Sequence, residues 1–192
     1  MHHRVKNNLQ IISSLLYLQS HSIKDKTVMD MLLDSQNRIK SIGLVHEKLY
    51  QSKNFARIDF KKYIYDLSSY LFNSYRINMN IILLNINVGD MYLNINKAIP
   101  CGLIINELLT NALKHAFTDG RKGKISIKFH RENDNKLILE IRDNGKGLPE
   151  GLNIETSSSL GLKLVKNLAK QIDGKLYIER ETGTIFKIIF PS

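Results

Sequence analysis

Residues 101–117 read CGLIINELLTNALKHAF, and their apolar positions recur with the period of an α-helix. Pro100, directly before this stretch, can begin such a helix because the first turn needs no N–H from it. At ~100° per residue, four apolar side chains lie within about 30° of one direction, namely Ile105, Leu109, Ala112 and Ala116. We therefore expect this face of the helix to pack against a core.

The opposite side of the same helix is polar. Glu107, Asn111 and Lys114 lie within roughly 60° of one another, and His115 lies at the edge of this group. Such groups suit a magnesium-bound polyphosphate, because an Asn oxygen can ligate the cation, Lys can meet a phosphate and Glu can orient an attacking group. The alternative is an ordinary solvated face with a stabilising i,i+4 pair. The helix pattern alone leaves both interpretations open.

Strand and helix patterns alternate through the C-terminal two-thirds of the chain. Helices are predicted at 60–72 and 160–172, and strands at 77–88, 124–130, 136–143, 174–180 and 184–190. With the helix of residues 101–117, they predict an α+β fold in which helices form a layer on a sheet.

Two glycine-containing segments are candidate ligand loops. The strand ending in RDNGKGLP places Asp143 before Gly145 and Gly147, which permit close approach of the backbone to a flat or phosphorylated ligand. An ordinary Asn-Gly turn is the alternative. Gly161 lies in the first turn of the helix at 160–172, where backbone amides are able to bind phosphate. The segment ETSSS at 155–159 is expected to be a flexible lead into that helix.

The first fifty residues predict a helical hairpin with a turn at 21–25. Its first helix has the apolar stripe Val5, Leu9, Ile12 and Leu16, and its second helix runs from Thr27 to about Ser52. Two such helices leave their apolar seams half exposed, so we expect the hairpin of a second copy to complete a four-helix bundle in a homodimer. His3 lies roughly 150° from the stripe and is expected to face solvent.

Composition limits the class of protein. The 192 residues include 28 Lys and Arg against 18 Asp and Glu, a net charge of +10. No block of like charges or basic-aromatic interleaving appears, so we expect an acidic protein partner and no nucleic acid. The single cysteine, Cys101, fits a reducing compartment, and no apolar run of about 18 residues predicts a membrane span. We expect a cytoplasmic chain, and helical periodicity from the first residues suggests the C-terminal part of a longer protein.

In their order, these segments resemble the transmitter region of sensor histidine kinases. There, a dimerisation and histidine-phosphotransfer hairpin precedes an ATP-binding domain of the fold shared with gyrase, Hsp90 and MutL. The opening HRVKNNL is similar to the phosphoacceptor box His-Arg-x-Lys-Asn, and the resemblance implies His3 as the acceptor. It also implies a dimeric bundle hairpin at 1–53 and an ATP-binding domain at 58–192.

The resemblance extends to the boxes that contact nucleotide. NELLTNALKHAF resembles the N box, which implies Asn111 as magnesium ligand, Glu107 as activating acid, and Lys114 and His115 as nucleotide contacts. DNGKGLP resembles a glycine box whose aspartate, here Asp143, binds the adenine amino group. Further positions match the glycine boxes of the family, namely Gly145, Gly147, Gly161, Gly183 and Thr184.

The resemblance implies an ATP- and Mg²⁺-dependent protein histidine kinase that phosphorylates His3 and passes the phosphoryl group to an aspartate of a response-regulator receiver domain. Two alternatives stay open. One is a histidine phosphotransfer scaffold that has lost ATP, which serines at 157–159 in place of the usual glycines would favour. The other is an ATPase or serine kinase of the same nucleotide-binding fold. The general base is open as well, between Glu107 and solvent.

Overall fold

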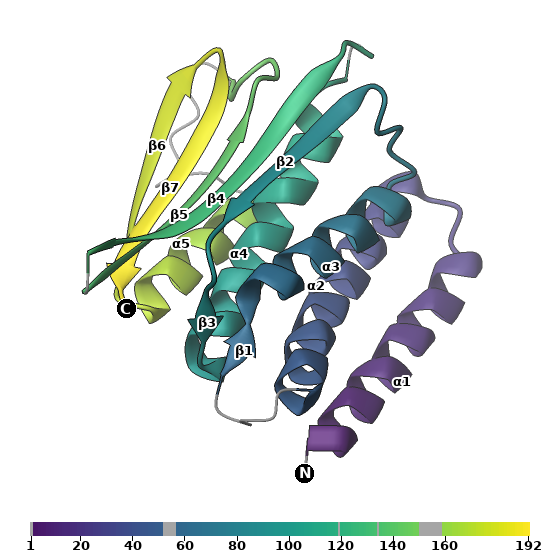
Figure 1. Cartoon of the computed structure of the whole chain (residues 1–192). Coiled ribbons are helices and arrows are strands. Elements are labelled where there is room, and N and C mark those ends of the chain that lie inside the picture. The colour runs from purple at the N-terminus through teal and green to yellow at the C-terminus, as the bar shows by residue number, and fades with distance from the viewer. Residues whose placement is uncertain (1, 52–56, 119, 134, 150–158) are drawn as a thin grey trace.

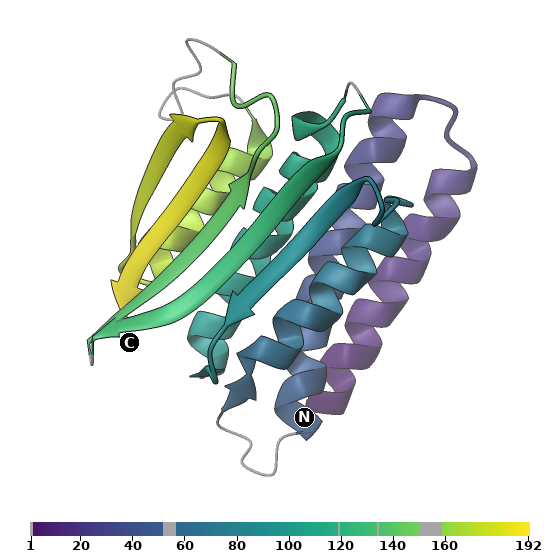
Figure 2. The same cartoon turned by 45° about the horizontal axis from the view of Figure 1, so that its top comes forward.

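In the structure, a computed structural model, three helices lie on one face of a sheet, and a two-helix hairpin packs beside them (Figure 1). It describes residues 2–51, 57–118, 120–133, 135–149 and 159–192. Both figures show the other face of the sheet without a helix over it, as far as the described residues go (Figure 2). The expected α+β architecture is confirmed.

The N-terminal hairpin consists of α1 (His2–His21) and α2 (Lys26–Gln51). Asp25 starts α2, because its Oδ1 accepts hydrogen bonds from the backbone N–H groups of Thr27 at 2.7 Å and Val28 at 3.2 Å. The hairpin and its turn are thus confirmed. Figure 1 shows α1 outermost, with α2 between it and the rest of the molecule.

The main sheet has five strands in the order β2-β4-β5-β7-β6. They are β2 (Ile82–Val88), β4 (Gly123–Asn133), β5 (Lys136–Asp143), β6 (Lys175–Glu181) and β7 (Gly183–Pro191). β2 and β4 are parallel, and the other neighbours are antiparallel. A second, two-stranded sheet joins β1 (Ile58–Asp59) and β3 (Tyr92–Leu93).

The helices on the sheet are α3 (Phe60–Ser74), α4 (Ile95–Asn111) with a terminal π-helical turn η1 (Ala112–Ala116), and α5 (Leu160–Gln171). The predicted packing face of α4 is confirmed, because Ile105, Leu109, Ala112 and Ala116 are all buried. α4 also crosses from β2 to the parallel strand β4, so it lies at the centre of the helical layer.

The start of α4 differs from the prediction. Pro100 does not begin the helix but lies within it, five residues after the first residue, Ile95. Asn94 is the N-cap, and its side-chain oxygen accepts a hydrogen bond from the Lys97 N–H at 3.1 Å. An Asn cap satisfies an otherwise unpaired amide of the first turn, which outweighs the weaker start signal of proline.

The second hairpin helix is packed into the same core as the sheet domain. Leu44, Val45 and Leu49 of α2 are buried within the continuous apolar cluster that contains the sheet and α3 to α5. Ser41 of α2 and Tyr63 of α3 share a buried hydrogen bond of 2.7 Å. α2 is therefore a structural part of the helical layer on the sheet, and not only one half of the N-terminal hairpin.

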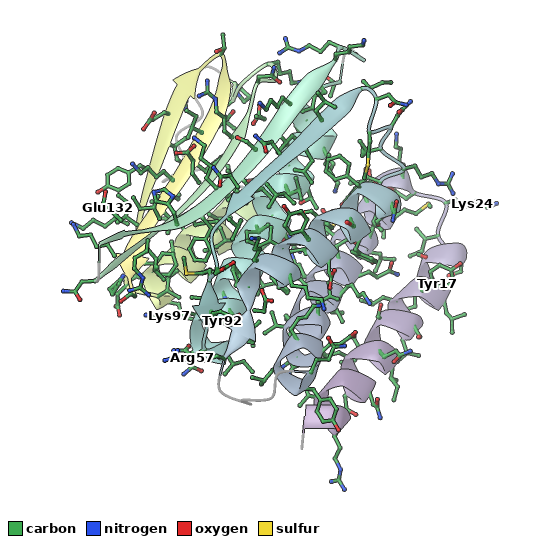
Figure 3. All side chains as sticks on the ribbon, in the orientation of Figure 1. Tyr17, Lys24, Arg57, Tyr92, Lys97 and Glu132 are labelled. Carbon is green, nitrogen blue, oxygen red and sulfur yellow. The ribbon has the colours of Figure 1, made fainter. Side chains whose placement is uncertain are left out.

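The outer side of α1 has the opposite character. Ile11, Leu15 and Leu18 are 59%, 55% and 66% exposed, and Tyr17 projects from the same helix (Figure 3). Ile11, Leu15 and Leu18 thus form an exposed apolar surface, which we call the α1 outer face.

None of the described helices is long and apolar enough to cross a membrane.

Candidate functional site

A cavity of about 280 Å³ opens between the C-terminal end of α4, the end of β5 and the start of α5. Its polar lining residues are Asn111, His115, Asp143, Lys146, Ser159 and Thr184. The remaining lining residues are Leu108, Ala112, Ala116, Gly147, Leu148, Pro149, Leu162 and Phe186. We call this cavity the α4–β5 pocket. Apolar walls with a few convergent polar groups are typical of a small-molecule site.

Asp143 is the buried acid of the pocket. It is the last residue of β5, where the strand pairing with Ile125 and Thr184 fixes its backbone. The Gly145 N–H donates to Asp143 Oδ1 at 2.8 Å and orients the carboxylate. Burial raises the pKa of Asp143, while hydrogen bonds from the backbone of Gly145 and Thr184 hold part of that rise back. A buried, oriented acceptor of this kind is suited to bind an amino group.

Asn111 and His115 line the same pocket one helical turn apart. His115 lies in η1, where burial and the nearby charges of Lys114 and Lys146 lower its pKa. Because the ordinary histidine pKa is about 6.5, the imidazole is mostly neutral at pH 7. Lys146 supplies positive charge at the pocket wall, and its Nζ donates to Thr118 Oγ1 at 3.2 Å. These groups can meet an anion at the open side of an otherwise apolar slot.

Glu107 lies on a different side of α4 and contacts α2. Arg38 donates from Nε to Glu107 Oε1 and from Nη2 to Oε2, each at 2.7 Å. Asn106 Nδ2 adds a hydrogen bond to Oε1 at 3.0 Å, and Glu107 is only 3% exposed. The hydrogen bond to Glu107 raises the pKa of Arg38. The carboxylate is therefore fully engaged by the protein.

Lys114 also points to α2, where its Nζ forms an ion pair with Asp34. Tyr75, at the end of α3, donates to Asp34 Oδ1 at 3.0 Å, and Asn37 Nδ2 donates to the Tyr75 hydroxyl at 3.0 Å. Burial and the neighbouring Asp34 carboxylate raise the pKa of Tyr75, so this phenol stays protonated and donates. α2 thus supplies partners for Glu107 and Lys114, two of the charged residues that were expected to serve a ligand.

Two predicted ligand glycines have a packing role. A Cβ on Gly145 would overlap Ala116 of η1, and the adjacent Lys146 N–H donates to the Ala116 carbonyl at 3.0 Å. Gly183 has a φ of +97°, and a Cβ there would overlap the Asp143 carbonyl. Both residues allow the pocket loops to approach the neighbouring backbone, and neither lines the cavity itself.

The structure thus divides the predicted site residues into two groups. The pocket brings together Asn111, His115, Asp143, Gly147 and Thr184, whereas Glu107, Lys114, Gly145, Gly161 and Gly183 do not line it. Gly161 instead faces Glu107, since a Cβ there would lie 2.9 Å from Oε2. His3 lies in the first turn of α1, and its side chain, like residues 155–158 of the expected flexible segment, is outside the described part of the chain.

Sequence reasoning missed several lining residues. Lys146 lies inside the DNGKGLP segment, so its charge next to a predicted ligand loop was a usable signal. Phe186 and Leu162 come from β7 and α5, and each follows an ordinary apolar pattern of its element. No local feature distinguishes them from core residues, because only the tertiary fold directs them to the pocket.

The chain matches two protein families. Residues 1–75 match a family described as histidine kinase, and residues 96–192 match the histidine kinase-, DNA gyrase B- and HSP90-like ATPase family. The second match covers α4 from its second residue and every lining residue of the α4–β5 pocket. ATP binding is implied by the description of that family.

Two curated relatives and one solved structure extend this similarity. Sensor histidine kinase PdtaS of Mycobacterium tuberculosis is 35% identical over 96% of this chain and 37% of its own length. Blue-light-activated histidine kinase 2 of Erythrobacter litoralis is 28% identical over 98% of this chain and 55% of its own length. The chain therefore spans about half or less of these relatives. The histidine kinase domain of an Erythrobacter litoralis blue-light activated histidine kinase shares the fold, with a TM-score of 0.76, 22% identity, and coverage of 96% of this chain and 94% of that domain.

Proposed function

Because the chain belongs to the histidine kinases, with an ATPase domain of the gyrase B and HSP90 type, we propose that it phosphorylates its own His3 from Mg-ATP and passes the group to a receiver aspartate. The single observation that carries this proposal is the α4–β5 pocket, which combines a buried acceptor, apolar walls and basic side chains in about 280 Å³. We also propose a cytoplasmic location, which is consistent with ATP as the phosphoryl donor.

Recognition of the base rests on Asp143. The Gly145 amide already orients its carboxylate, so an exocyclic amino group of adenine has a fixed acceptor to bind. Leu108, Leu162 and Phe186 offer apolar contacts to a flat ring. Burial raises the pKa of Asp143 despite its backbone donors, and a bound amino group would offset this cost of burying the carboxylate further.

The phosphates are assigned to the polar side of the pocket. His115 and Lys146 would meet phosphate oxygens, and the Asn111 carboxamide would hold Mg²⁺. The described residues contain no cluster of three or more His, Cys, Asp or Glu side chains that could hold a metal. A site with one amide oxygen nevertheless fits magnesium, which keeps several waters and binds largely through substrate phosphates. When bound, Mg²⁺ would supply charge neutralisation at the phosphates.

The transfer step is a displacement at the γ-phosphorus. The unprotonated ring nitrogen of His3 forms the N–P bond, the bond from the γ-phosphorus to the bridging oxygen breaks, and ADP leaves with that electron pair. The other ring nitrogen then loses its proton to a base. Glu107 is paired with Arg38 in this arrangement, so either solvent takes the proton or Glu107 does so after it is released.

His3, the proposed acceptor, can meet the nucleotide in the α4–β5 pocket only after a rearrangement within one chain, or if one copy supplies His3 and another copy supplies the nucleotide. Leu9 and Gln10 of α1 line a groove with Gly43 and Glu47 of α2, so the start of α1 lies near the C-terminal part of α2. Asp34, in the N-terminal half of α2, contacts Lys114 beside the α4–β5 pocket. At 1.5 Å per residue, these regions of α2 are roughly 15–20 Å apart. Figure 1 shows the N-terminus at the bottom of the view, with α2 between α1 and α4.

A second copy is the proposed partner of the α1 outer face. Ile11, Leu15 and Leu18 are exposed side by side on one helix, and the same face on a second hairpin would bury them in a four-helix bundle. The proposed receiver domain would dock near the first turn of α1 to reach His3. The net charge of +10 would favour an acidic receiver surface.

Labelling with [γ-³²P]ATP tests the function. We expect acid-labile, base-stable label on the wild type, none on His3→Gln, and none on Asn111→Ala, which should remain a dimer. Failure of calorimetry to detect nucleotide binding would favour the scaffold without ATP. Label that persists on His3→Gln would favour an ATPase or serine kinase. Dissociation of the Asn111→Ala dimer would contradict the role given to Asn111.

A further inference from the structure

The two edges of the five-stranded sheet differ in charge. β6 borders the sheet on one side, and four of its seven residues are charged, namely Lys175, Glu179, Arg180 and Glu181. β2 borders the sheet on the other side, and its sequence, ILLNINV, contains no charged residue. Charges on an edge strand hinder its pairing with a strand of another molecule. β2 therefore lacks the protection that β6 has.

The backbone of β2 can accept a further strand. Hydrogen bonds of Ile81 and Gly89 with β4 show that the odd-numbered residues of this segment direct their N–H and C=O groups towards β4. The direction alternates along a strand, so Leu84 and Ile86 direct theirs to the free edge. No described residue pairs with them there, and β4 is the only described element in extensive backbone contact with β2.

Apolar side chains are exposed beside this edge. Leu83 is exposed and points to the face of the sheet that has no described helix over it, because the next residue, Leu84, points to the core. Met79 and Ile81, directly before the strand, are exposed as well. On the helical side, Leu84 and Ile86 are only partly buried. An added strand would therefore cover apolar surface on both faces of β2.

A second copy of the chain is the partner that this edge fits. The chain has a net charge of +10, so two copies repel each other over much of their surface, whereas residues 77–89 contain no charged residue. An acidic partner would instead gain from lysines along its contact strand, and β2 has none. A two-fold axis places a strand opposite itself, and an uncharged strand can pair in this way because no like charges meet.

The centre of β2 gives the register of such a pair. With antiparallel strands and the two-fold axis at Asn85, Leu84 exchanges backbone hydrogen bonds with Ile86 of the second copy. The two Asn85 residues then lie opposite each other, with Cα atoms ~4.5 Å apart, on the face without helices. A carboxamide both donates and accepts hydrogen bonds, so Asn85 is complementary to its own copy. Leu84 and Ile86 meet on the helical side and extend the core.

We propose that β2 pairs antiparallel with β2 of a second copy, so that the two five-stranded sheets join into one. This contact is separate from the α1 outer face, as Figure 1 shows, and it does not depend on the proposed kinase function. A chain with one two-fold contact on the hairpin and another at the sheet edge would link bundle dimers to one another. One strand pair is small next to a standard interface of about 1,200–2,000 Å², so we expect weak, concentration-dependent association.

Sedimentation equilibrium of the full chain tests the contact by placing a charge at the two-fold axis. Asn85 is exposed, so Asn85→Lys and Asn85→Asp should both fold. We expect each variant alone to associate about fivefold more weakly than wild type at the step that β2 supplies, because like charges then lie opposite each other. An equimolar mixture of the two should return to within about twofold of wild type, because opposite charges then meet.

Tyr177→Lys is the matched control, since it adds the same charge at an exposed position of the other edge strand, β6. It should associate like wild type. The proposal is overturned if wild type, Asn85→Lys and Asn85→Asp have the same mass at every concentration, or if the mixture associates no better than either variant alone. Labelling of His3 is measured separately, so this failure is distinguishable from failure of the kinase function.

A cysteine at the two-fold axis gives an independent measurement. The expected Cα separation at Asn85 suits a disulfide, so Asn85→Cys should form a covalent dimer when diamide oxidises it. The native Cys101 is buried and should not react. Tyr177→Cys is the exposed control and should crosslink far less. Equal crosslinking of the two variants overturns the β2 pair, even if a lysine or aspartate at position 85 prevents folding.

Discussion

The two polar sides of α4 contain similar residues in different states. On the side facing α2, Glu107 and Lys114 are paired with Arg38 and Asp34. On the side facing β5 and α5, polar groups of α4 and of Asp143 border an open cavity. On the first side, which we call the closed side, the charged groups are paired within the protein. On the second, which we call the open side, acceptors and donors remain for a ligand. Substitutions should therefore alter stability on the closed side and ligand affinity on the open side.

The largest effect is expected in the buried packing between α4 and α3. A side chain at Gly102 would overlap the buried ring of Tyr63, so Gly102→Val should lower the free energy of unfolding by roughly 3 kcal/mol in urea titrations. Gly43→Ala in α2 is the control, because nothing lies within 4 Å of its Cβ position. That variant should gain up to about 1 kcal/mol. Equal stability of both variants would contradict the packing argument.

The open side should respond in binding. Asp143→Ala removes a charged acceptor, so we expect its Mg-ATP affinity to fall about 30-fold by calorimetry, which corresponds to about 2 kcal/mol. Without nucleotide, thermal unfolding should show only a small loss of stability, because the variant removes the acceptor of the Gly145 N–H. The proposed difference between the two sides would be contradicted if Asp143→Ala bound ATP normally, or if it unfolded as readily as Gly102→Val.

A smaller effect is expected for the ion pair between Asp34 and Lys114. A double-mutant cycle with Asp34→Asn and Lys114→Met should give a coupling energy of about 1 kcal/mol in unfolding experiments, because the pair is largely shielded from solvent. The exposed pair of Lys61 and Asp90, whose charged atoms are 3.5 Å apart, should show no measurable coupling. Similar coupling energies for the two pairs would contradict the prediction that the ion pair on the closed side is stronger than an exposed one.

The smallest effect concerns pH. The folded-state pKa of Asp143 is raised, so the folded protein binds this proton more tightly than the unfolded chain does. Its ionisation therefore lowers stability as pH rises from the ordinary aspartate pKa, near 4, through the folded-state value. We expect Asp143→Asn without nucleotide to be slightly more stable than wild type at pH 7. The difference should vanish near pH 3 in pH-dependent urea unfolding, and a difference that grows towards low pH would contradict this sign.

The sequence predicts the elements better than it predicts their neighbours. Periodicity sufficed for the hairpin, for the apolar face of α4 and for the end of β5 at Asp143. It grouped Glu107, Asn111 and Lys114 as one working face, since they lie within roughly 60° on a helical wheel. The structure splits them because α2 covers part of that sector and the pocket takes the rest. Which neighbour covers which sector is a tertiary property, and no local spacing encodes it.

The close approach at Gly102 has an evolutionary consequence. The space that its absent Cβ leaves is filled by the Tyr63 ring, whose hydroxyl reaches Ser41, so one point of contact ties together α4, α3 and α2. A larger residue at 102 would be tolerated only in a lineage that had already shortened the side chain at 63. That shortening would in turn leave the hydroxyl at 41 to find another partner. Substitutions at these three positions should therefore be inherited as a set, in a fixed order, and not drift independently.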